Sequence, residues 1–180
     1  MRPLRLLILL LVLTIALLVA LIRPLPVSAG EAATSNAKQT RKHSNPRRRR
    51  HLLAMRAARR REHRLVKYAR RFIGVPYEWG GSSPRYGSDC SGFVRFVYQR
   101  FGISLPHSSY GDLSRGKRAL RKYLKPGDLV FFDGGGHVGI YVGRNRLIDA
   151  PHSGAVVHVS TMSDWYSYDY YGARRLLPSS

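Results

Sequence analysis

The sequence predicts an α+β domain, in which a helix carrying the only cysteine of the chain packs on an antiparallel β-sheet. Two patterns indicate this class. After Cys90, apolar residues recur at helical spacing over residues 93–101. The last third of the chain instead alternates short β-rich runs with glycine-rich turns. A length of 180 residues leaves room for one modest domain and an extension.

Residues 1–29 are typical of a secretory signal peptide. A basic start precedes an apolar run over residues 6–22, and small residues at Val27 and Ala29 predict cleavage after Ala29. The apolar run is also long enough to span a bilayer, so an uncleaved membrane anchor is the alternative. Both alternatives predict an exported protein that is secreted, associated with the cell wall, or periplasmic.

Residues 30–61 predict a disordered linker that becomes a strongly basic helix. Between Lys38 and Arg71 many basic residues accompany a single acid, Glu62, and the whole chain has a net charge of +21. Such a segment suits nucleic acid, anionic polymers or lipid head groups, or it is simply a solvated charged face. Because the chain is predicted to be exported, we expect wall polyanions or the membrane surface as its partner, and no nucleic acid.

A helix is predicted over residues 52–73, leading into a domain expected over residues 62–180. Its last turns carry an apolar stripe, and Gly74 followed by Pro76 ends it. A glycine-rich loop then brings the chain to Cys90, at the first turn of a helix that Gly102 closes.

Cys90 is predicted to be a nucleophile. Unpaired backbone N–H groups and the positive end of the helix dipole favour a thiolate at the first turn of a helix. A buried structural cysteine is the commoner fate of a free thiol. The polar, glycine-rich flanks and the lack of a second cysteine in an exported chain argue against that alternative.

The rest of the chain predicts a second, weaker helix around residues 109–123 and then a sheet. The expected strands are residues 129–132, 137–142, 146–150, 155–160 and 171–177. In the strand over 137–142, His137 and Tyr141 lie on one face, and Val138 and Ile140 on the other.

A hairpin joins two of these strands and predicts a catalytic constellation. With a three-residue loop at 143–145, Gly139 faces Asp149, which makes His137 and Asp149 diagonal neighbours on one face. An imidazole near Cys90 can accept its proton, and a carboxylate can fix the imidazole tautomer. A register slip of one residue would bring His152 to that face instead.

Three stretches together resemble the NlpC-type (new lipoprotein C, or p-sixty) family of cell-wall endopeptidases. They are VPYEWGGSSPRYGSDCSGF, KPGDLVFFDGGGHVGIYVG and RLIDAPHSGAVV, and the resemblance extends over residues 65–177 in the family's order and spacing. It implies a papain-like core whose cysteine helix packs on an antiparallel sheet. It also implies hydrolysis of peptidoglycan stem peptides, most often between the γ-carboxyl of D-glutamate and diaminopimelate or lysine.

The resemblance implies roles for individual residues. Cys90 becomes the nucleophile, His137 the general base, and Asp149 the third polar residue, where many members have histidine. The other site residues are expected to contact substrate: Tyr77 near the oxyanion position, Trp79 as a wall, Asp89 and Ser91 on the terminal amine of a stem peptide, and His107 in the groove. We expect His152 to line the groove as well, and His158 to be a surface residue of a strand.

The sequence thus predicts a thiol protease that hydrolyses peptidoglycan without a cofactor or a metal. An amidase that cuts between muramic acid and L-alanine is the alternative within the same class. A non-catalytic wall-binding protein is the alternative from another class, but it would need no cysteine, histidine and carboxylate together.

Overall fold

The computed structural model describes residues 45–163 and 169–178. From Arg47 onward, the described residues belong to one compact unit. The signal peptide, the alternative membrane anchor and the linker predicted for residues 30–44 lie outside the described residues. Within the described residues, no helix combines the length and the apolar character needed to cross a membrane.

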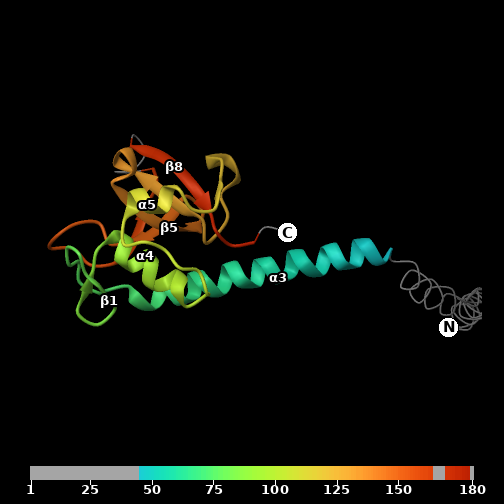
Figure 1. Ribbon diagram of the computed structural model, residues 1–180, viewed down its shortest axis with the longest axis horizontal. Helices are drawn as coiled ribbons and strands as arrows, with labels where there is room; N and C mark the ends of the chain where they lie inside the picture. The colour runs from blue at the N-terminus through green and yellow to red at the C-terminus, as the bar shows by residue number, and fades with distance from the viewer. Residues whose placement is uncertain (1–44, 164–168, 179–180) are drawn as a thin grey trace, which may run out of the picture. The chain divides into compact units, whose positions relative to one another are not determined.

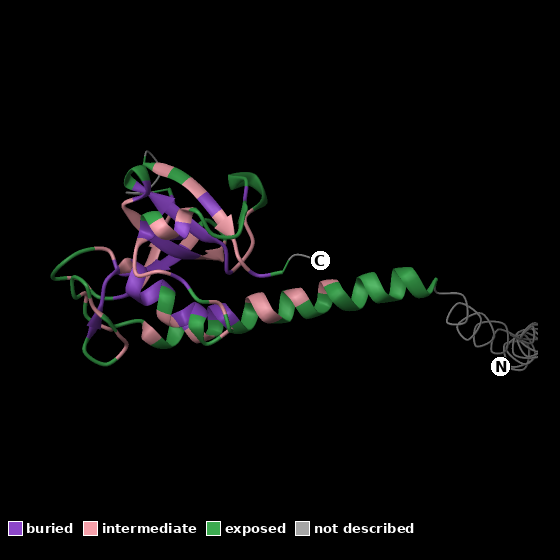
Figure 2. Cartoon of the chain, in the orientation of Figure 1, coloured by how far each residue is buried: buried purple, intermediate pink, exposed green. Residues whose placement is uncertain are grey.

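Helix α3 (Pro46–Ala69) leads into the domain and continues as a 3-10 turn, η1 (Arg70–Phe72) (Figure 1). It begins earlier than the predicted residue 52, because Pro46 suits a first helical turn and the arginines, leucines and alanines that follow favour helix. All residues over 46–54 are exposed, whereas Leu65, Val66 and Ala69 are buried (Figure 2). Only the C-terminal half of α3 is therefore anchored in the core.

Helix α4 (Cys90–Gln99) confirms the helix predicted after Cys90. Its apolar face, which includes Phe93 and Val97, packs in one cluster with the last turns of α3 and with the sheet. Gly102 follows it with a φ of 73°, the left-handed conformation that glycine tolerates at a helix end. The hydroxyl of Tyr98 donates to the carbonyl of Gly127 and so joins α4 to the loop before the sheet.

The main sheet is antiparallel and has six strands in the order β3-β8-β4-β5-β6-β7. The strands are β3 (Lys117–Arg118), β4 (Leu129–Phe132), β5 (His137–Gly143), β6 (Arg146–Asp149), β7 (His158–Thr161) and β8 (Tyr170–Arg175). Two short strands, β1 (Ser82–Ser83) and β2 (Gly87–Ser88), pair in the loop before α4. The short elements between strands are α5 (Ser109–Leu113), η2 (Arg121–Tyr123) and η3 (Asp133–Gly135).

Both faces of the sheet are covered. Val138 and Ile140 of β5 belong to the cluster that contains α4, as their predicted face requires. Phe132 and Leu147 belong to a second cluster on the opposite face, which also includes Met162. A helix packed on an antiparallel sheet is the α+β class that the sequence predicts.

The hairpin between β5 and β6 has the predicted register but a shorter loop. Arg144 and Asn145 form a two-residue turn with φ values of 54° and 58°, and Gly143 pairs with Arg146. A register shift between Tyr141 and Gly143 follows, so that Ile140 pairs with Ile148. The bulge compensates for the shorter turn, which is why the predicted neighbours still meet.

Two predicted elements differ in the structure. The helix expected over residues 109–123 is wrong, because α5 ends at Leu113, Gly116 adopts a φ of 68°, and β3 then pairs with β8. The strand expected over residues 155–160 begins at His158 instead. The preceding residues pair with the loop after α3, where the N–H of Tyr77 donates to the carbonyl of Ala155 at 2.9 Å.

Candidate active site

Cys90 is the first residue of α4, and Asp89 caps that helix. The backbone N–H groups of a first helical turn have no carbonyl partner within the helix. Oδ1 of Asp89 accepts the N–H of Gly92 at 2.7 Å and so satisfies one of them. The cap fixes where α4 begins and thereby the position of the thiol.

Asp89 also joins α4 to two neighbouring loops. Oδ1 accepts the hydroxyl of Ser91 at 3.0 Å, and Oδ2 accepts the N–H of Gly80 at 3.0 Å. Nε2 of His107 lies 3.0 Å from both carboxylate oxygens. Three predicted substrate residues, Asp89, Ser91 and His107, therefore form one bonded cluster beside Cys90.

His137 and Asp149 meet across the β5–β6 hairpin. Oδ2 of Asp149, which is fully buried, lies 2.9 Å from Nε2 of His137. Gly139 lies on β5, two residues after His137. A Cβ added to it would lie 3.1 Å from Cβ of Asp149 and 2.5 Å from Cδ1 of Leu147, both on β6. The absence of a side chain at this position lets β6 approach closely enough for the pair to form.

The partners of His137 decide its charge. Burial lowers the pKa of His137, but its hydrogen bonds to Asp149 and Cys90, together with the charges of both, raise that pKa to about 9. Because Nε2 faces Asp149, Nδ1 is the ring nitrogen left for the thiol of Cys90. The imidazolium therefore persists at neutral pH and stabilises a negative charge on Cys90.

Cys90 and His137 open into a cleft of about 350 Å³. Tyr77 lies at this cleft, and burial, then the charges of Cys90 and Asp89, raises the pKa of its phenol. The hydroxyl of Tyr77 thus stays protonated and available as a donor. The described lining residues are Tyr77, Trp79, Cys90, Phe132, Asp133, Gly136, His137, Pro151, His152 and Asp169.

The structure separates the predicted site residues into two groups. Tyr77, Trp79, Cys90 and His137 line the cleft, and Asp149 lies behind His137. The three members of the Asp89 cluster are not among the described lining residues of the cleft.

The two other histidines near the site differ in their surroundings. His152 is exposed at the cleft, with Nδ1 2.9 Å from the carbonyl oxygen of Ser153. His158 lies on the edge strand β7, as expected, and is half-buried there; its Nε2 lies 3.0 Å from Oγ of Ser160.

Sequence reasoning missed Ser160. Its hydroxyl donates to Oδ1 of Asp149 at 2.7 Å, on the side of the carboxylate away from His137. The sequence did place Ser160 in a predicted strand. It did not show that this strand pairs with β6 and so brings Ser160 beside Asp149, because a loop separates the two strands in the chain.

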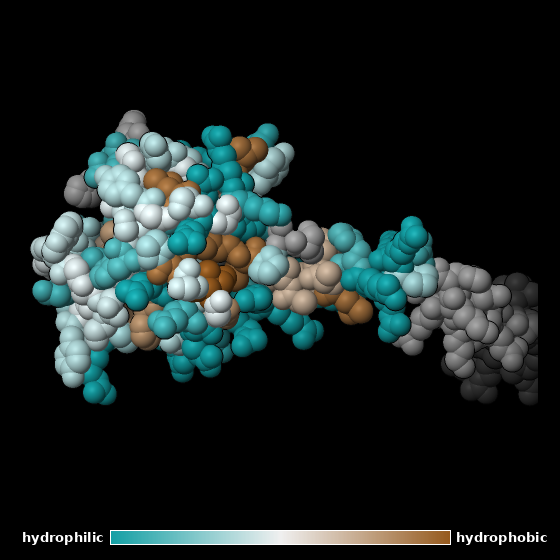
Figure 3. Space-filling model, in the orientation of Figure 1, coloured by the Kyte–Doolittle hydropathy of each residue, from teal (hydrophilic) through white to brown (hydrophobic). Residues whose placement is uncertain are grey.

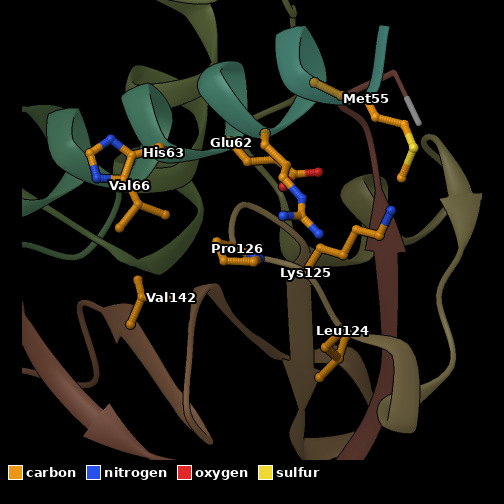
Figure 4. A pocket seen from close by; sticks show the side chains of 10 residues that line it. Met55, Glu62, His63, Val66, Leu124, Lys125, Pro126 and Val142 are labelled. Carbon is orange, nitrogen blue, oxygen red and sulfur yellow. The ribbon is translucent and has the colours of Figure 1, made fainter. Parts of the chain in front are cut away.

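A larger hollow of about 470 Å³ shares no lining residue with this cleft (Figure 4). It lies between α3, which contributes Met55, Glu62 and Val66, and the segment before β4, which contributes Leu124 and Pro126. It has no thiol among its described lining residues. Across the part of the chain that the structure describes, no group of three histidine, cysteine or acidic residues is placed to hold a metal ion.

A thiol at a helix N-terminus, an imidazole bonded to it and a buried carboxylate behind the imidazole are the groups that cysteine hydrolases employ. Comparison with known proteins agrees with this class. The model of the NlpC/P60 family matches residues 74–175, which is more than half of the chain. The chain therefore belongs to the NlpC/P60 family.

Individual relatives are similar over the same domain. Gamma-DL-glutamyl hydrolase of Bacillus subtilis (strain 168) is 39% identical over 117 residues, covering 62% of this chain and 28% of that protein. Murein DD-endopeptidase MepH of Escherichia coli (strain K12) is 41% identical over 114 residues, covering 58% of this chain and 42% of that protein. The chain thus spans less than half the length of these two curated relatives.

A solved structure shows the same fold. The crystal structure of an NlpC/P60 family protein from Bacillus cereus ATCC 10987 superimposes with a TM-score of 0.62 at 35% identity. The superposition covers 65% of this chain and 40% of the other. The fold expected from the sequence is confirmed by this likeness.

Proposed function

We propose that the protein is an exported cysteine endopeptidase that hydrolyses the peptide stems of peptidoglycan. The observation that carries the proposal is the arrangement of Cys90, His137 and Asp149 at one cleft. Both curated relatives described above are named as hydrolases or endopeptidases, one of them of murein. Export rests on the signal-like pattern of residues 1–29.

The reaction begins with attack of the Cys90 thiolate on the carbonyl carbon of the scissile amide. His137, held as an imidazolium by Asp149, donates its Nδ1 proton to the leaving amine as the C–N bond breaks. Water then attacks the thioester and gives a proton to the neutral imidazole of His137. The C–S bond breaks, the carboxylic acid leaves, and the thiolate–imidazolium pair is restored. Asp149 orients the ring throughout, because its Oδ2 accepts a hydrogen bond from the Nε2–H group of His137.

The oxyanion that forms during both steps needs hydrogen-bond donors. The backbone N–H of Cys90 lies in the first turn of α4, where no helical carbonyl precedes it. The protonated hydroxyl of Tyr77 lies at the same cleft. We assign both as donors to the oxyanion.

The bond we assign joins the γ-carboxyl of D-glutamate to diaminopimelate or lysine. Two carboxylates, Asp133 and Asp169, line the cleft and would attract the free amine of a diamino acid. The name of the Bacillus subtilis relative also refers to a γ-glutamyl bond. The amidase alternative, which cuts between muramic acid and L-alanine, has no comparable use for these carboxylates.

Mass spectrometry of the products tests this function. Purified peptidoglycan and soluble muropeptides would be incubated with the protein and with Cys90→Ala. Fragments cut after γ-D-glutamate that disappear with Cys90→Ala would support both the reaction and the nucleophile. Release of intact stem peptides would favour the amidase, and no product with binding retained would favour the non-catalytic wall-binding protein.

We further propose that α3 binds a linear polyanion of the cell wall. Arg47–Arg50 are exposed, and because they are consecutive in a helix their side chains point in directions spread around its axis. In the view of Figure 3 the N-terminal end of α3 is hydrophilic, and the exposed Leu52 and Leu53 follow the four arginines in the sequence. Because the arginines surround the helix axis, this end of α3 has no separate apolar side with which to lie on a membrane. A flexible polymer can contact all sides of such a helix, whereas a flat membrane contacts one.

Binding to purified wall, with and without its anionic polymer, tests this partner. Replacing Arg47–Arg50 by glutamine should weaken binding about 100-fold, at roughly 1 kcal/mol or less for each charge. Replacing four other exposed basic residues (Arg85, Arg95, Lys117 and Lys122) by glutamine is the matched control. Equal weakening by both sets, or binding that high salt leaves unchanged, would count against the proposal.

A further inference from the structure

A polar row crosses three adjacent strands behind the cleft. His137 lies on β5, Asp149 on β6, and His158 with Ser160 on β7. Asp149 pairs with His158 in the register of the sheet, and Leu147 pairs with Ser160. Directly paired residues share a face, so the side chains of Asp149, His158 and Ser160 all point the same way.

Contacts of hydrogen-bond length connect this row from one end to the other. Nε2 of His137 lies 2.9 Å from Oδ2 of Asp149, and the hydroxyl of Ser160 donates to Oδ1 of the same carboxylate at 2.7 Å. Oγ of Ser160 lies 3.0 Å from Nε2 of His158, whose Nδ1 lies 2.9 Å from the carbonyl oxygen of Val156. The two carboxylate oxygens of Asp149 thus have different partners: Oδ2 contacts His137, and Oδ1 accepts from Ser160.

The hydroxyl of Ser160 has one proton, and it donates that proton in the hydrogen bond to Oδ1 of Asp149. Ser160 can then only accept from Nε2 of His158. Because the carbonyl of Val156 can also only accept, Nδ1 carries a proton as well, and His158 is an imidazolium when both hydrogen bonds are formed. The carbonyl of Val156 holds the other ring nitrogen and fixes the plane of the imidazole. His158 therefore orients the lone pairs of Ser160, and Ser160 orients Asp149.

We propose that Ser160 and His158 are positioning residues, which hold the Asp149 carboxylate in the rotamer that presents Oδ2 to His137. This inference rests on the proposed cysteine peptidase activity, and it deepens it by extending the catalytic row two residues beyond the triad. Neither residue touches the reacting atoms. Their effect passes through Asp149, whose complete burial makes each hydrogen bond to its charge important for its orientation.

A pair of variants with nearly the same shape isolates the hydroxyl. Ser160→Thr keeps the donor, and Ser160→Val replaces it with a methyl group of similar size; both residue types suit a β-strand. We expect Ser160→Val to lower kcat about 10-fold to 100-fold with KM within about twofold, and Ser160→Thr to retain most of the activity. Ser114→Ala, which removes an exposed hydroxyl bonded to Gly111, is the control and should match the native protein.

The second readout is the imidazole of His137, followed by NMR in protein labelled at histidine. Loss of the Ser160 hydroxyl should lower the pKa of His137 and speed exchange of its Nε2 proton with water. A purely structural role for Ser160 would move neither. His158→Phe should change both in the same direction but less, because the hydroxyl of Ser160 still reaches Asp149.

The outcomes separate this inference from the proposed function. Identical kcat and identical His137 titration in the Val and Thr variants would overturn the positioning role, even with full peptidase activity. If His158→Phe changes neither the pKa of His137 nor the exchange rate of its Nε2 proton, the positioning role of His158 is overturned. Were the native protein to release no product from peptidoglycan, the proposed function would fail, yet the NMR titration would still decide whether Ser160 and His158 position Asp149.

Discussion

Replacing Asp149 by asparagine removes a charge while keeping the shape of a fully buried side chain. The difference between the ordinary histidine pKa of 6.5 and the value of about 9 for His137 corresponds to about 3 kcal/mol in favour of the imidazolium. That preference survives although burial opposes it, so the hydrogen bonds and charges of Asp149 and Cys90 must outweigh the desolvation of the ring. Without the carboxylate, the imidazolium should lose much of this stabilisation.

The assay is the pH dependence of kcat/KM on a soluble muropeptide between pH 5 and 11. In the proposed mechanism His137 is the acid that protonates the leaving amine, so native activity should fall as the pH rises through about 9. In Asp149→Asn this alkaline limb should move at least about one pH unit towards acid, because one pH unit corresponds to only 1.36 kcal/mol. At pH 8, kcat should fall by about 100-fold or more, since an amide orients the ring less strictly.

Asp133→Asn is the matched control, because it removes one carboxylate from the same cleft. It should raise KM for substrates with a free amine and leave the alkaline limb where it is. An Asp149→Asn enzyme whose alkaline limb coincides with the native one would refute the reasoning, since the charge of Asp149 would then not set the protonation of His137.

Three further changes test the fold and its coupling to the site. Both carboxylate oxygens of Asp112 are buried and lack a hydrogen-bond partner among the described residues, and burial raises its pKa from 3.8 to about 7. Folding therefore favours the protonated form of Asp112, and the free energy of unfolding falls as the pH rises from 3.8 towards 7. In urea unfolding at pH 8, Asp112→Asn should raise that free energy by up to about 4 kcal/mol, because the variant has no charge to bury. Gly139→Ala should lower kcat about tenfold or more with little change in KM. The new Cβ would lie 2.5 Å from Leu147 and 3.1 Å from Cβ of Asp149, and would push β6 away from His137; unchanged kinetics would contradict this. Arg175→Met should cost about 3 kcal/mol in unfolding experiments, because the buried Asp128 then loses the two hydrogen bonds of 2.6 and 2.7 Å that Arg175 donates and, among the described residues, keeps only the one from the N–H of Lys125. A loss no larger than that caused by replacing an exposed arginine would contradict this reasoning.

The parts of the fold that could be predicted are those that local pattern and sequence neighbours decide. The helix after Cys90 follows from apolar spacing and from Gly102, and the β5–β6 register follows because only a short turn separates the two strands. The expected helix over residues 109–123 failed for the opposite reason. Its residues pair with β8, more than fifty residues later, and tertiary pairing overrode a weak helical preference.

The same division holds at the candidate site. Cys90, His137 and Asp149 could be identified because one lies at a helix start and the other two on one hairpin. The bonded cluster of Asp89 with His107 could not, since a loop brings His107 back to the start of α4. Ser160 was hidden in the same way, because its bond to Asp149 depends on how β7 docks against β6.

The sequence by itself predicted the class of the domain, a candidate nucleophile and the imidazole–carboxylate pair, because each depends on residues close together in the chain. The tertiary structure alone decided which groups surround them: the charge of His137, the aromatic and acidic lining of the cleft, and the row that continues through Ser160 to His158. Burial and long-range pairing set these properties. Both arise only when distant segments pack together, and periodicity within a segment does not encode them.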